Sequence, residues 1–378
     1  MKAGAVSRTA LATHSRHASG QSGYAAMMNG ENAVQNQKAE KDIELGGLGM
    51  LIAGDVGGTK TDLAIFSSEA GPHSPFAQAQ VRSADYPNLQ AIVTEFLAKV
   101  NKPVDRACFA VPGPVIEGRV KTTNLPWVIE ESALAQELNL NARSVHLIND
   151  LEAIARAVPI LGPSDVETIS TGQPVPKGAI AVIAPGTGLG ESFLTWDGTG
   201  YVAHSSEGGH SDFAPADERQ IHLLEYMLKQ FDHVSFEHVC SGIGIPYLYR
   251  YLRDVEHLPE DPEVAKLIDS ARDPSFVIIS QAMDPANACK LCAATIDLCI
   301  SILAAEAGNL AVKVLSTSGV YLAGGVATRV LRVIKEPGFM ERFKRKGRFA
   351  ELMGRVPVHV VVTPAALAGA AASGLEIP

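Results

Sequence analysis

Residues 50–66 read MLIAGDVGGTKTDLAIF, two apolar runs joined by a glycine-rich turn. The runs at 50–56 and 62–66 have the composition of β-strands, and Gly57-Gly58-Thr59 suits a tight turn between them, so the segment predicts a β-hairpin. Backbone N–H groups at such a glycine turn can form a nest that binds an anion such as a phosphate. An ordinary structural hairpin has the same signature, so the segment alone leaves both interpretations open.

The same turn has part of a Walker A phosphate loop. Gly54 and the pair Lys60-Thr61 fall at positions of that motif, but Thr59 stands where its second glycine is required. A Walker A loop also opens a helix, whereas residues 62–66 have strand character. The segment is therefore predicted to lie at the tip of a hairpin, and Asp55 beside it would repel phosphate unless Mg²⁺ bridges the two.

A second glycine turn repeats this pattern about 130 residues further along the chain. Residues 179–184 form an apolar run, Gly186-Thr187-Gly188-Leu189-Gly190 form a turn, and residues 191–196 form another apolar run. One such turn is a weak signal, but two glycine hairpins at equivalent points of two similar segments indicate a duplication. Such a pair of turns suits a nucleoside triphosphate held between two halves.

Strand and helix patterns alternate after each hairpin. Strands are expected at 78–83, 107–111, near 120–128, at 145–148, 320–323 and 356–362, and helices from Asn88, at 132–138, from Leu151, at 217–231 and at 287–315. This alternation predicts an α/β protein with helices packed on its sheets. We expect two lobes around a central cleft, a small lobe over residues 49–160 and a large lobe over residues 161–378.

The first 48 residues lack this pattern. Residues 1–30 contain three basic residues and no acidic residue, which resembles an organelle transit peptide. Met27, Met28 and Met50 offer alternative starts, so an overextended gene start explains the segment equally well. Residues 1–48 are predicted to be a disordered extension, and the sequence leaves its role open.

The chain has 378 residues and a formal net charge of −9. General binding to nucleic acid needs a basic footprint, and anionic membranes attract basic segments, so the charge argues against both partners. No continuous apolar run reaches 18 residues, so no transmembrane helix is predicted. The five cysteines are interpreted as free thiols in a reducing compartment, which favours a cytoplasmic protein.

Three of the cysteines lie close together in sequence. Cys289 and Cys292 form a C-x-x-C pair, and Cys299 follows seven residues later within the same helical pattern. A zinc or redox site is one interpretation, but no second Cys/His pair with metal-ligand spacing stands near. Packing of the three thiols as small apolar groups against another helix is the preferred interpretation.

Asn149 and Asp150 end one apolar strand and precede a helix. Asp150 as the helix N-cap, worth about 1 kcal/mol, is one interpretation. The other is a general base at the carboxyl end of a strand, where α/β proteins place their sites. In phosphoryl transfer to a hydroxyl, an Asp carboxylate commonly accepts the hydroxyl proton.

The segment Ser206-Glu207-Gly208-Gly209-His210 places an acid and a histidine in a glycine-containing turn. A sugar needs several rigid hydrogen-bonding groups that converge on it, and Glu207 and His210 can supply two. A metal site would need a further ligand, for which Asp212 is available. A simple capped turn at the surface explains the residues as well.

These motifs resemble the bacterial-type glucokinase family of the hexokinase–actin–Hsp70 superfamily. The resemblance covers about residues 50–375, and seven motifs occur in the family's order. They read GDVGGTKTDLAIF, FAVPGPVIEGRVKTTNLPW, LINDLEAIA, APGTGLGESFL, SEGGHSDFAP, HVSFEHVCSGIGIPYLYR and GVYLAGGVATR. Each motif is modest alone, but the set in this order is specific. Lys60-Thr61 and the N-terminal extension depart from the family pattern.

The resemblance implies a duplicated actin/hexokinase-like, ribonuclease H-like fold and transfer of the ATP γ-phosphoryl group to the 6-hydroxyl of glucose. Asp150 would be the general base. The sugar-binding residues would be Asn124, Asn149, Asp150, Glu207, His210 and Glu237. The ATP-binding residues would be Gly54, Asp55, Val56, Gly57, Gly58, Thr59, Gly186, Thr187, Gly188, Gly324 and Gly325. Mg²⁺ would be carried by ATP near Asp55, with no direct protein ligand, and a homodimer is the family expectation.

Several alternatives stay open. A kinase for another hexose, or one that takes polyphosphate as its donor, would share these motifs. The related repressor/open-reading-frame/kinase (ROK) family usually has a cysteine-rich zinc motif near the equivalent histidine, whereas no cysteine follows His210 until Cys240. A sugar-sensing regulator would need a DNA-binding module, and the N-terminus has no paired-helix pattern. An actin-like filament protein would leave Glu207, His210 and Glu237 unexplained.

Overall fold

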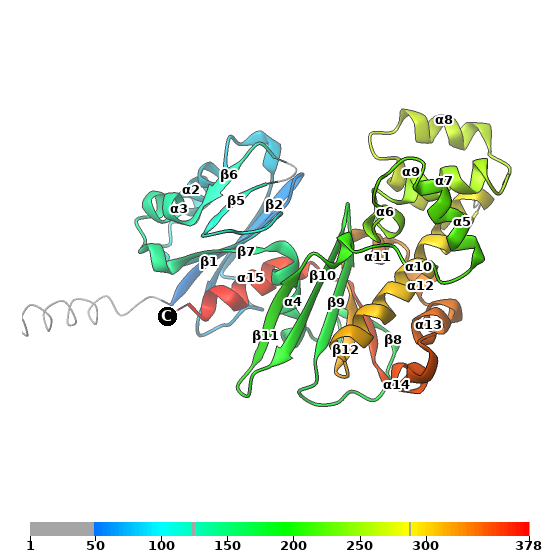
Figure 1. The fold of residues 1–378 in the computed structure, drawn as a ribbon. Coiled ribbons are helices and arrows are strands. Elements are labelled where there is room, and N and C mark those ends of the chain that lie inside the picture. Colours follow the sequence, from blue (N-terminus) through cyan, green and yellow to red (C-terminus); the bar gives the residue numbers. More distant parts are fainter. Residues whose placement is uncertain (1–48, 123–124, 287–288, 378) are drawn as a thin grey trace, which may run out of the picture. The chain divides into compact units, whose positions relative to one another are not determined.

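The computed structural model describes residues 49–122, 125–286 and 289–377, and these belong to one compact unit. The predicted extension over residues 1–48 and the predicted sugar-binding residue Asn124 lie outside the described residues. Within the unit, helices cover two large β-sheets (Figure 1), so the predicted α/β class is confirmed.

The first sheet contains the hairpin at residues 50–66. Its order is β3-β2-β1-β4-β7, with β1 at Met50–Val56, β2 at Lys60–Ser67, β3 at Ala77–Arg82, β4 at Arg106–Val111 and β7 at Val145–Asn149. β1 and β2 pair antiparallel, as the hairpin prediction requires, and β1, β4 and β7 run parallel. A separate pair, β5 (Arg119–Lys121) with β6 (Val128–Glu130), stands where a single extended stretch is predicted near residues 120–128.

The second sheet repeats this order. It runs β11-β10-β9-β12-β13-β8, with β8 at Val166–Ser170, β9 at Ile180–Pro185, β10 at Leu189–Trp196, β11 at Tyr201–Ser206, β12 at Gly319–Leu322 and β13 at Val358–Val361. In each half, the third, second, first, fourth and fifth strands lie side by side, and the first, fourth and fifth are parallel. The predicted duplication of an actin/hexokinase-like architecture is therefore confirmed, with β8 as an additional edge strand.

Helices follow the strands in both halves. The first half contains α2 (Leu89–Val100), α3 (Glu131–Leu138) and α4 (Asp150–Ala157). The second contains α5 (Glu218–Met227), α6 (Glu237–Cys240), α7 (Ile245–Asp254), α8 (Pro262–Ser270), α9 (Pro274–Met283), α10 (Lys290–Val314), α11 (Gly324–Arg329), α12 (Leu331–Ile334), α13 (Pro337–Lys344), α14 (Ala350–Arg355) and α15 (Ala365–Leu375). α2 begins where predicted, because the Asn88 side chain accepts a hydrogen bond from Ala91 N at 2.9 Å.

The long helix α10 packs on β9 of the second sheet, and α7, α9 and α13 pack against α10 (Figure 1). By length and composition it could cross a membrane, although the sequence contains no continuous apolar run of 18 residues; 78% of its most apolar window is buried inside the protein. Cys292 and Cys299 are free, buried thiols within α10, whereas Cys289 caps its N-terminus rather than lying inside the helix. These cysteines pack as the sequence analysis prefers.

Helices α4 and α15 cross between the two sheets at a contact that only glycine allows. A Cβ added to Gly369 of α15 would overlap the carbonyl oxygen of Ala153 in α4. From this crossing, α15 packs on the first sheet in an apolar cluster that contains Leu51, Ala153 and Ala370. α4 also packs on the second sheet, through a cluster that contains Leu151. The last helix of each half thus contacts the sheet of the other half.

Substitution of Gly369 by alanine is expected to lower the free energy of unfolding, because a methyl group there would push the two helices apart. Overpacking of this kind costs about 1–3 kcal/mol, and the loss should appear in urea unfolding. Gly338→Ala in α13 is the control, since an added Cβ there meets nothing within 4 Å; it should be neutral or stabilising. Equal stability of G369A and wild type would show that the crossing is loosely packed.

Candidate active site

The first residues of β10 are the point on which several predicted site segments converge. Leu189 N donates a hydrogen bond to Glu237 Oε2 at 2.9 Å. A Cβ added to Gly209 would overlap the Leu189 carbonyl, and one added to Gly190 would lie 2.8 Å from a methyl group of Leu151. The predicted sugar turn, α6 and the start of α4 therefore all contact the same short piece of strand.

These segments enclose a cavity of about 440 Å³. The predicted catalytic and sugar-binding residues that line it are Asn149, Asp150, Glu207, His210 and Glu237. The predicted ATP-binding residues that line it are Gly186, Thr187, Gly188 and Gly324. Gly325 and the first glycine turn, residues 54–59, are not part of this lining. The cavity thus brings together predicted site residues that are up to 175 positions apart in the sequence, from Asn149 to Gly324.

Asn149, not Asp150, caps helix α4. Its Oδ1 accepts hydrogen bonds from Leu151 N at 2.9 Å and Glu152 N at 3.3 Å, and its Nδ2 donates to Gly113 O at 3.1 Å. Asp150 is the first helical residue, so the interpretation of Asp150 as the N-cap is wrong. Because the neighbouring asparagine does the capping, the Asp150 carboxylate is left to face the cavity.

The first glycine turn is a tight hairpin that a hydrogen bond from Ser83 stabilises. Gly57 N donates to Lys60 O at 2.9 Å, and Ser83 Oγ donates to Gly57 O at 2.7 Å. Lys60 forms an ion pair with Asp62 at 3.2 Å. Gly54 serves strand packing, since an added Cβ would lie 2.7 Å from Leu63 and Phe109 side-chain atoms.

Asp55 is placed by this hairpin close to other carboxylates. It pairs with Asp62 across the two strands. Burial, with smaller contributions from the negative charges of Asp150 and Asp62, raises the pKa of Asp55 to about 6. Burial also raises the pKa of Asp150, while the hydrogen bond from Leu151 N opposes this rise. The ionised carboxylates of Asp55 and Asp150 therefore repel each other when no cation lies near them.

The second glycine turn is held by the segment after α6. Gly186 N donates to Gly188 O at 2.9 Å, Gly242 N donates to Gly186 O at 2.9 Å, and Ile243 N donates to Thr187 O at 3.0 Å. Gly324 adopts a φ of +83°, in the left-handed region that favours glycine, and an added Cβ would lie 2.7 Å from Pro185 O. This turn is thus fixed in place before any ligand binds.

The predicted sugar residues form a short row of polar groups. His210 Nε2 lies 3.9 Å from Glu207 Oε2, and His210 Nδ1 lies 4.0 Å from Glu237 Oε1. Asp212, considered above as a metal ligand, instead forms an ion pair with His233 Nε2 at 2.9 Å. The row can offer hydrogen-bond acceptors and a donor to a polyhydroxyl compound.

Other residues that complete the lining have no functional role in the sequence analysis. Pro112, Gly113 and Pro114 border the cavity, as do Leu151 and Ser206. Gly113 and its neighbouring prolines lie within the quoted motif at 109–127, but only their position beside Asn149 reveals a role. The sequence Pro112-Gly113-Pro114 predicts a turn, but these residues have no reactive or charged side chain that would indicate a site.

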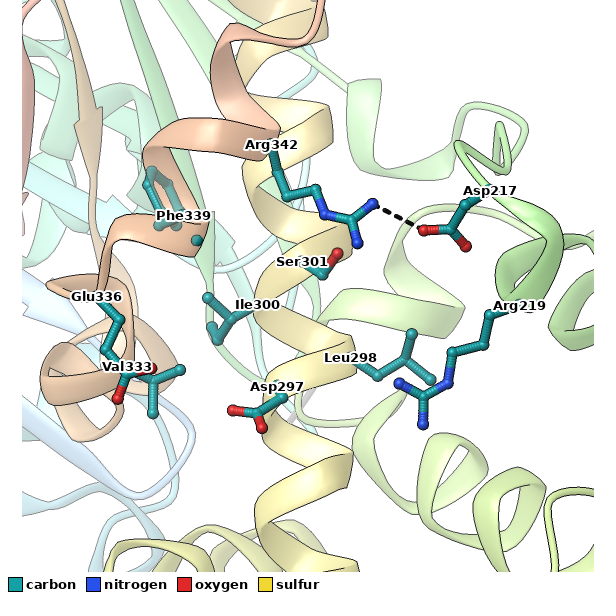
Figure 2. Close-up of a pocket in the computed structure, with 11 residues that line it drawn as sticks. Asp217, Arg219, Asp297, Leu298, Ile300, Ser301, Val333, Glu336, Phe339 and Arg342 are labelled. Carbon is teal, nitrogen blue, oxygen red and sulfur yellow. Dashed lines mark hydrogen bonds and ion pairs between the residues drawn. The ribbon is translucent and has the colours of Figure 1, made fainter.

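A second cavity, of about 250 Å³, lies among α5, α10, α12 and α13 (Figure 2). Its arginines are already paired, since Arg342 Nη1 lies 2.7 Å from Asp217 Oδ2 and Arg219 pairs with Glu256. No residue that the sequence predicts to be functional lines it. The candidate active site is therefore the first cavity.

The duplicated sheets, with a glycine hairpin in each half and a polar cavity beside the second, define a protein of the actin- and hexokinase-like class. The glucokinase family model matches residues 52–376. A glucokinase of Nostoc punctiforme is 38% identical over 330 residues, which span 83% of this chain and 95% of the relative. The chain belongs to the glucokinase family.

Solved structures agree with this assignment. A glucokinase from an Antarctic psychrotroph is 30% identical, with a TM-score of 0.72, and the match covers 86% of this chain and 98% of that one. A ROK family glucokinase from Streptomyces griseus, solved with glucose and AMPPNP, is 20% identical, with a TM-score of 0.56 and coverage of 85% and 98%. The second likeness shows the shared fold alone, and the predicted sugar-kinase class is confirmed at the level of the family.

Asp55→Asn is expected to stabilise the ligand-free protein above about pH 6. Between the pH at which an exposed aspartate ionises and about pH 6, the unfolded chain releases this proton while the folded protein keeps it, so the wild type loses stability over that window. Asparagine cannot ionise, so D55N should gain on the order of 1–3 kcal/mol over wild type at neutral pH and much less near pH 4. Urea unfolding at both pH values measures this, with exposed Asp85→Asn as the control. A D55N variant less stable than wild type at pH 7 would contradict the unfavourable burial.

Proposed function

We propose that the chain is a glucokinase that transfers the γ-phosphoryl group of ATP to the 6-hydroxyl of glucose. The observation that carries this proposal is the cavity that Asp150, the row Glu207–His210–Glu237 and the second glycine turn line together. Membership of the glucokinase family supports it. So does the structure of the Streptomyces griseus protein with glucose and AMPPNP, an ATP analogue.

Asp150 is the general base in this proposal. It accepts the proton of the 6-hydroxyl as that oxygen attacks the γ-phosphorus, while the bond from the γ-phosphorus to the bridging oxygen breaks and ADP leaves. Burial raises the pKa of Asp150, so its carboxylate is a stronger base than that of an exposed aspartate. The hydrogen bond from Leu151 N to Oδ1 orients the carboxylate.

The sugar hydroxyls bind to Glu207, His210 and Glu237, whose polar atoms face one side of the cavity. Asn149 contributes the N–H that its bond to Gly113 O leaves unused. Asn124 belongs to the proposed set on the family resemblance alone. Hydrogen-bonding groups that converge on a sugar discriminate between sugars, because a misplaced hydroxyl leaves one of them without a partner.

The ATP phosphates bind to backbone N–H groups of the two glycine turns, residues 54–59 and 186–188, and the adenosine lies against Gly324 and Gly325. The local chemistry fits Mg²⁺, since Asp55 and Asp150 are oxygen donors whose mutual repulsion a cation would offset. When bound with ATP, Mg²⁺ would neutralise charge on the transferring phosphoryl group. Asp55 would hold it through water.

We also propose that residues 49–160 and 161–378 act as a small and a large lobe that close on the substrates and exclude water. The crossing of α4 and α15 would be the pivot of this closure, because the two halves meet there. We propose a homodimer only because the family resemblance implies one. A cytoplasmic location rests on the acidic charge and on the free thiols of all five cysteines.

An assay of sugar-phosphate formation across hexoses, with ATP and polyphosphate as alternative donors, tests the function. We expect the highest kcat/KM with glucose, and turnover with ATP. A higher value with mannose or fructose would make the protein a kinase for that sugar, and turnover with polyphosphate alone would reassign the donor. Glucose binding without any transfer would favour a sugar-sensing regulator.

Asp150→Ala is expected to lower kcat by about 10²–10⁴-fold, the usual contribution of a general base. Asp150→Asn should lose as much, although it keeps an acceptor for Leu151 N. Circular dichroism and glucose binding serve as controls that both variants fold. Turnover close to wild type in either variant would remove Asp150 from the mechanism.

A further inference from the structure

A buried pair of glutamates lies beside the turn that carries Glu207 and His210. Glu191 on β10 is 1% exposed and Glu306 on α10 is 0% exposed. Their carboxyl groups are within hydrogen-bonding reach of each other, and neither lines the cavity. Two carboxyl groups can share a hydrogen bond only when one of them carries a proton.

The contacts of the pair indicate which member is protonated. Glu306 Oε2 accepts a hydrogen bond from Asn309 Nδ2 at 2.8 Å, and Glu306 Oε1 accepts one from Lys313 Nζ at 3.2 Å. Both oxygens of Glu306 thus act as acceptors, as in a carboxylate. Glu191 Oε1 is buried and has no such donor among the described residues, so Glu191 is the member that carries the proton.

The positive charge beside Glu191 and Glu306 balances one carboxylate but not two. On α10, Lys313 faces Glu306 directly. Lys346 Nζ donates a hydrogen bond to Asn309 Oδ1 at 2.7 Å, and Asn309 in turn donates to Glu306. On α6, the buried Cys240 thiol is neutral, because burial, with smaller contributions from Glu306 and Glu191, raises its pKa well above its ordinary value. A second buried carboxylate would therefore lack a counter-charge.

Glu191 also contacts the sugar turn directly. It pairs with Ser206 across β10 and β11, and Gly208 N donates to Ser206 Oγ at 2.9 Å. A Cβ added to Gly208 would overlap Glu191 Oε2. The Glu191 carboxyl group therefore packs against the backbone between Glu207 and His210, and a shift of that carboxyl group must move the turn.

We propose that Glu191 donates a hydrogen bond through its carboxylic proton to Glu306, and that this pair holds the 206–210 turn where Glu207 and His210 reach the sugar. Glu191 is thus a positioning residue. Burial and the charge of Glu306, opposed by Lys313, raise the pKa of Glu191 to about 8. Above that pH the pair becomes two carboxylates, the bond between them is lost and the turn moves.

The kinetic test rests on the proposed function. Glu191→Gln keeps a donor for Glu306 but cannot ionise. We expect the wild-type glucose KM to rise several-fold between about pH 7 and pH 9, and that of E191Q to stay flat, with similar kcat for both. Glu191→Ala, which removes the contact, should raise the glucose KM about tenfold at pH 7 with kcat within about twofold. An unchanged glucose KM in E191A would overturn the positioning role.

Two measurements test the acid pair without any turnover. Glu191 stays protonated in the folded protein up to about pH 8, so wild type should lose stability relative to E191Q from about pH 5 to pH 8. Infrared spectra should also contain a protonated-carboxyl band that E191Q lacks. Exposed Glu218→Gln is the matched control and should change neither. Parallel stability curves for wild type and E191Q, with no band lost, would overturn the pair.

Glu306→Gln covers the case in which E191A does not fold. It removes the negative charge that faces Glu191 and offers both a hydrogen-bond acceptor and an N–H donor, so Glu191 stays hydrogen-bonded in either protonation state and the alkaline rise in glucose KM should disappear. A rise at the same pH as in wild type would also count against the pair. Absence of glucose phosphorylation by the wild type would instead defeat the proposed function, and the stability and infrared measurements would still decide the pair.

Discussion

The contact between helices α4 and α15 is the constraint on which the rest of the structure depends. Gly369 and Ala153 approach so closely that no side chain fits at the glycine. Each helix then packs on the sheet of the opposite half, and Arg156 of α4 links to Glu376 just beyond α15 at 3.6 Å. Since Asn149 and Asp150 stand at the start of α4, the crossing that joins the halves also positions the proposed catalytic carboxylate.

A second principle of the site is close backbone packing at glycines. Gly188 lies against Glu237, Gly190 against Leu151 and Gly208 against Glu191. The two glycine turns are predicted to bind phosphate, but these three glycines also bring protein segments together. The backbone that carries the polar side chains of the site is therefore tightly packed. Preorganised recognition of a small ligand requires such a rigid backbone.

The acidic residues at and near the site differ in how deeply they are buried. Asp55 and Asp150 lie close enough for the charge of Asp150 to act on Asp55, and burial raises the pKa of both. Glu207 is largely exposed, with 74% of its side chain accessible, whereas Glu237 is held by Leu189 N. Behind them, Glu191 and Glu306 are buried completely. A neutral sugar and a cation-bound nucleotide are suitable partners for such a site, since a bare anion would be repelled.

The strands, the two hairpins and most of the candidate site residues could be predicted from sequence, because they depend on local patterns. Apolar runs joined by glycine turns indicate β1, β2, β9 and β10, and Asn88 indicates the start of α2. The short strands β8 and β11 lack a continuous apolar run, because their stability comes from neighbours far away in the chain. Helix α7 carries a helical apolar pattern that the prediction does not use, since Ile245, Leu248 and Leu252 are buried on one face. Asn149 was recognised as a site residue, but its role as the cap of α4 was not.

The sequence by itself determined the class of fold, the family and the residues with suitable chemistry, since motif order and residue type are written along the chain. Tertiary structure alone decided that α15 returns to the first sheet, that Asp150 is free of the capping role, and that Glu191 meets Glu306. Each of these depends on a contact between residues brought together by folding. Glu191 and Glu306 are 115 positions apart, and no local pattern records that one buried carboxyl group will face another.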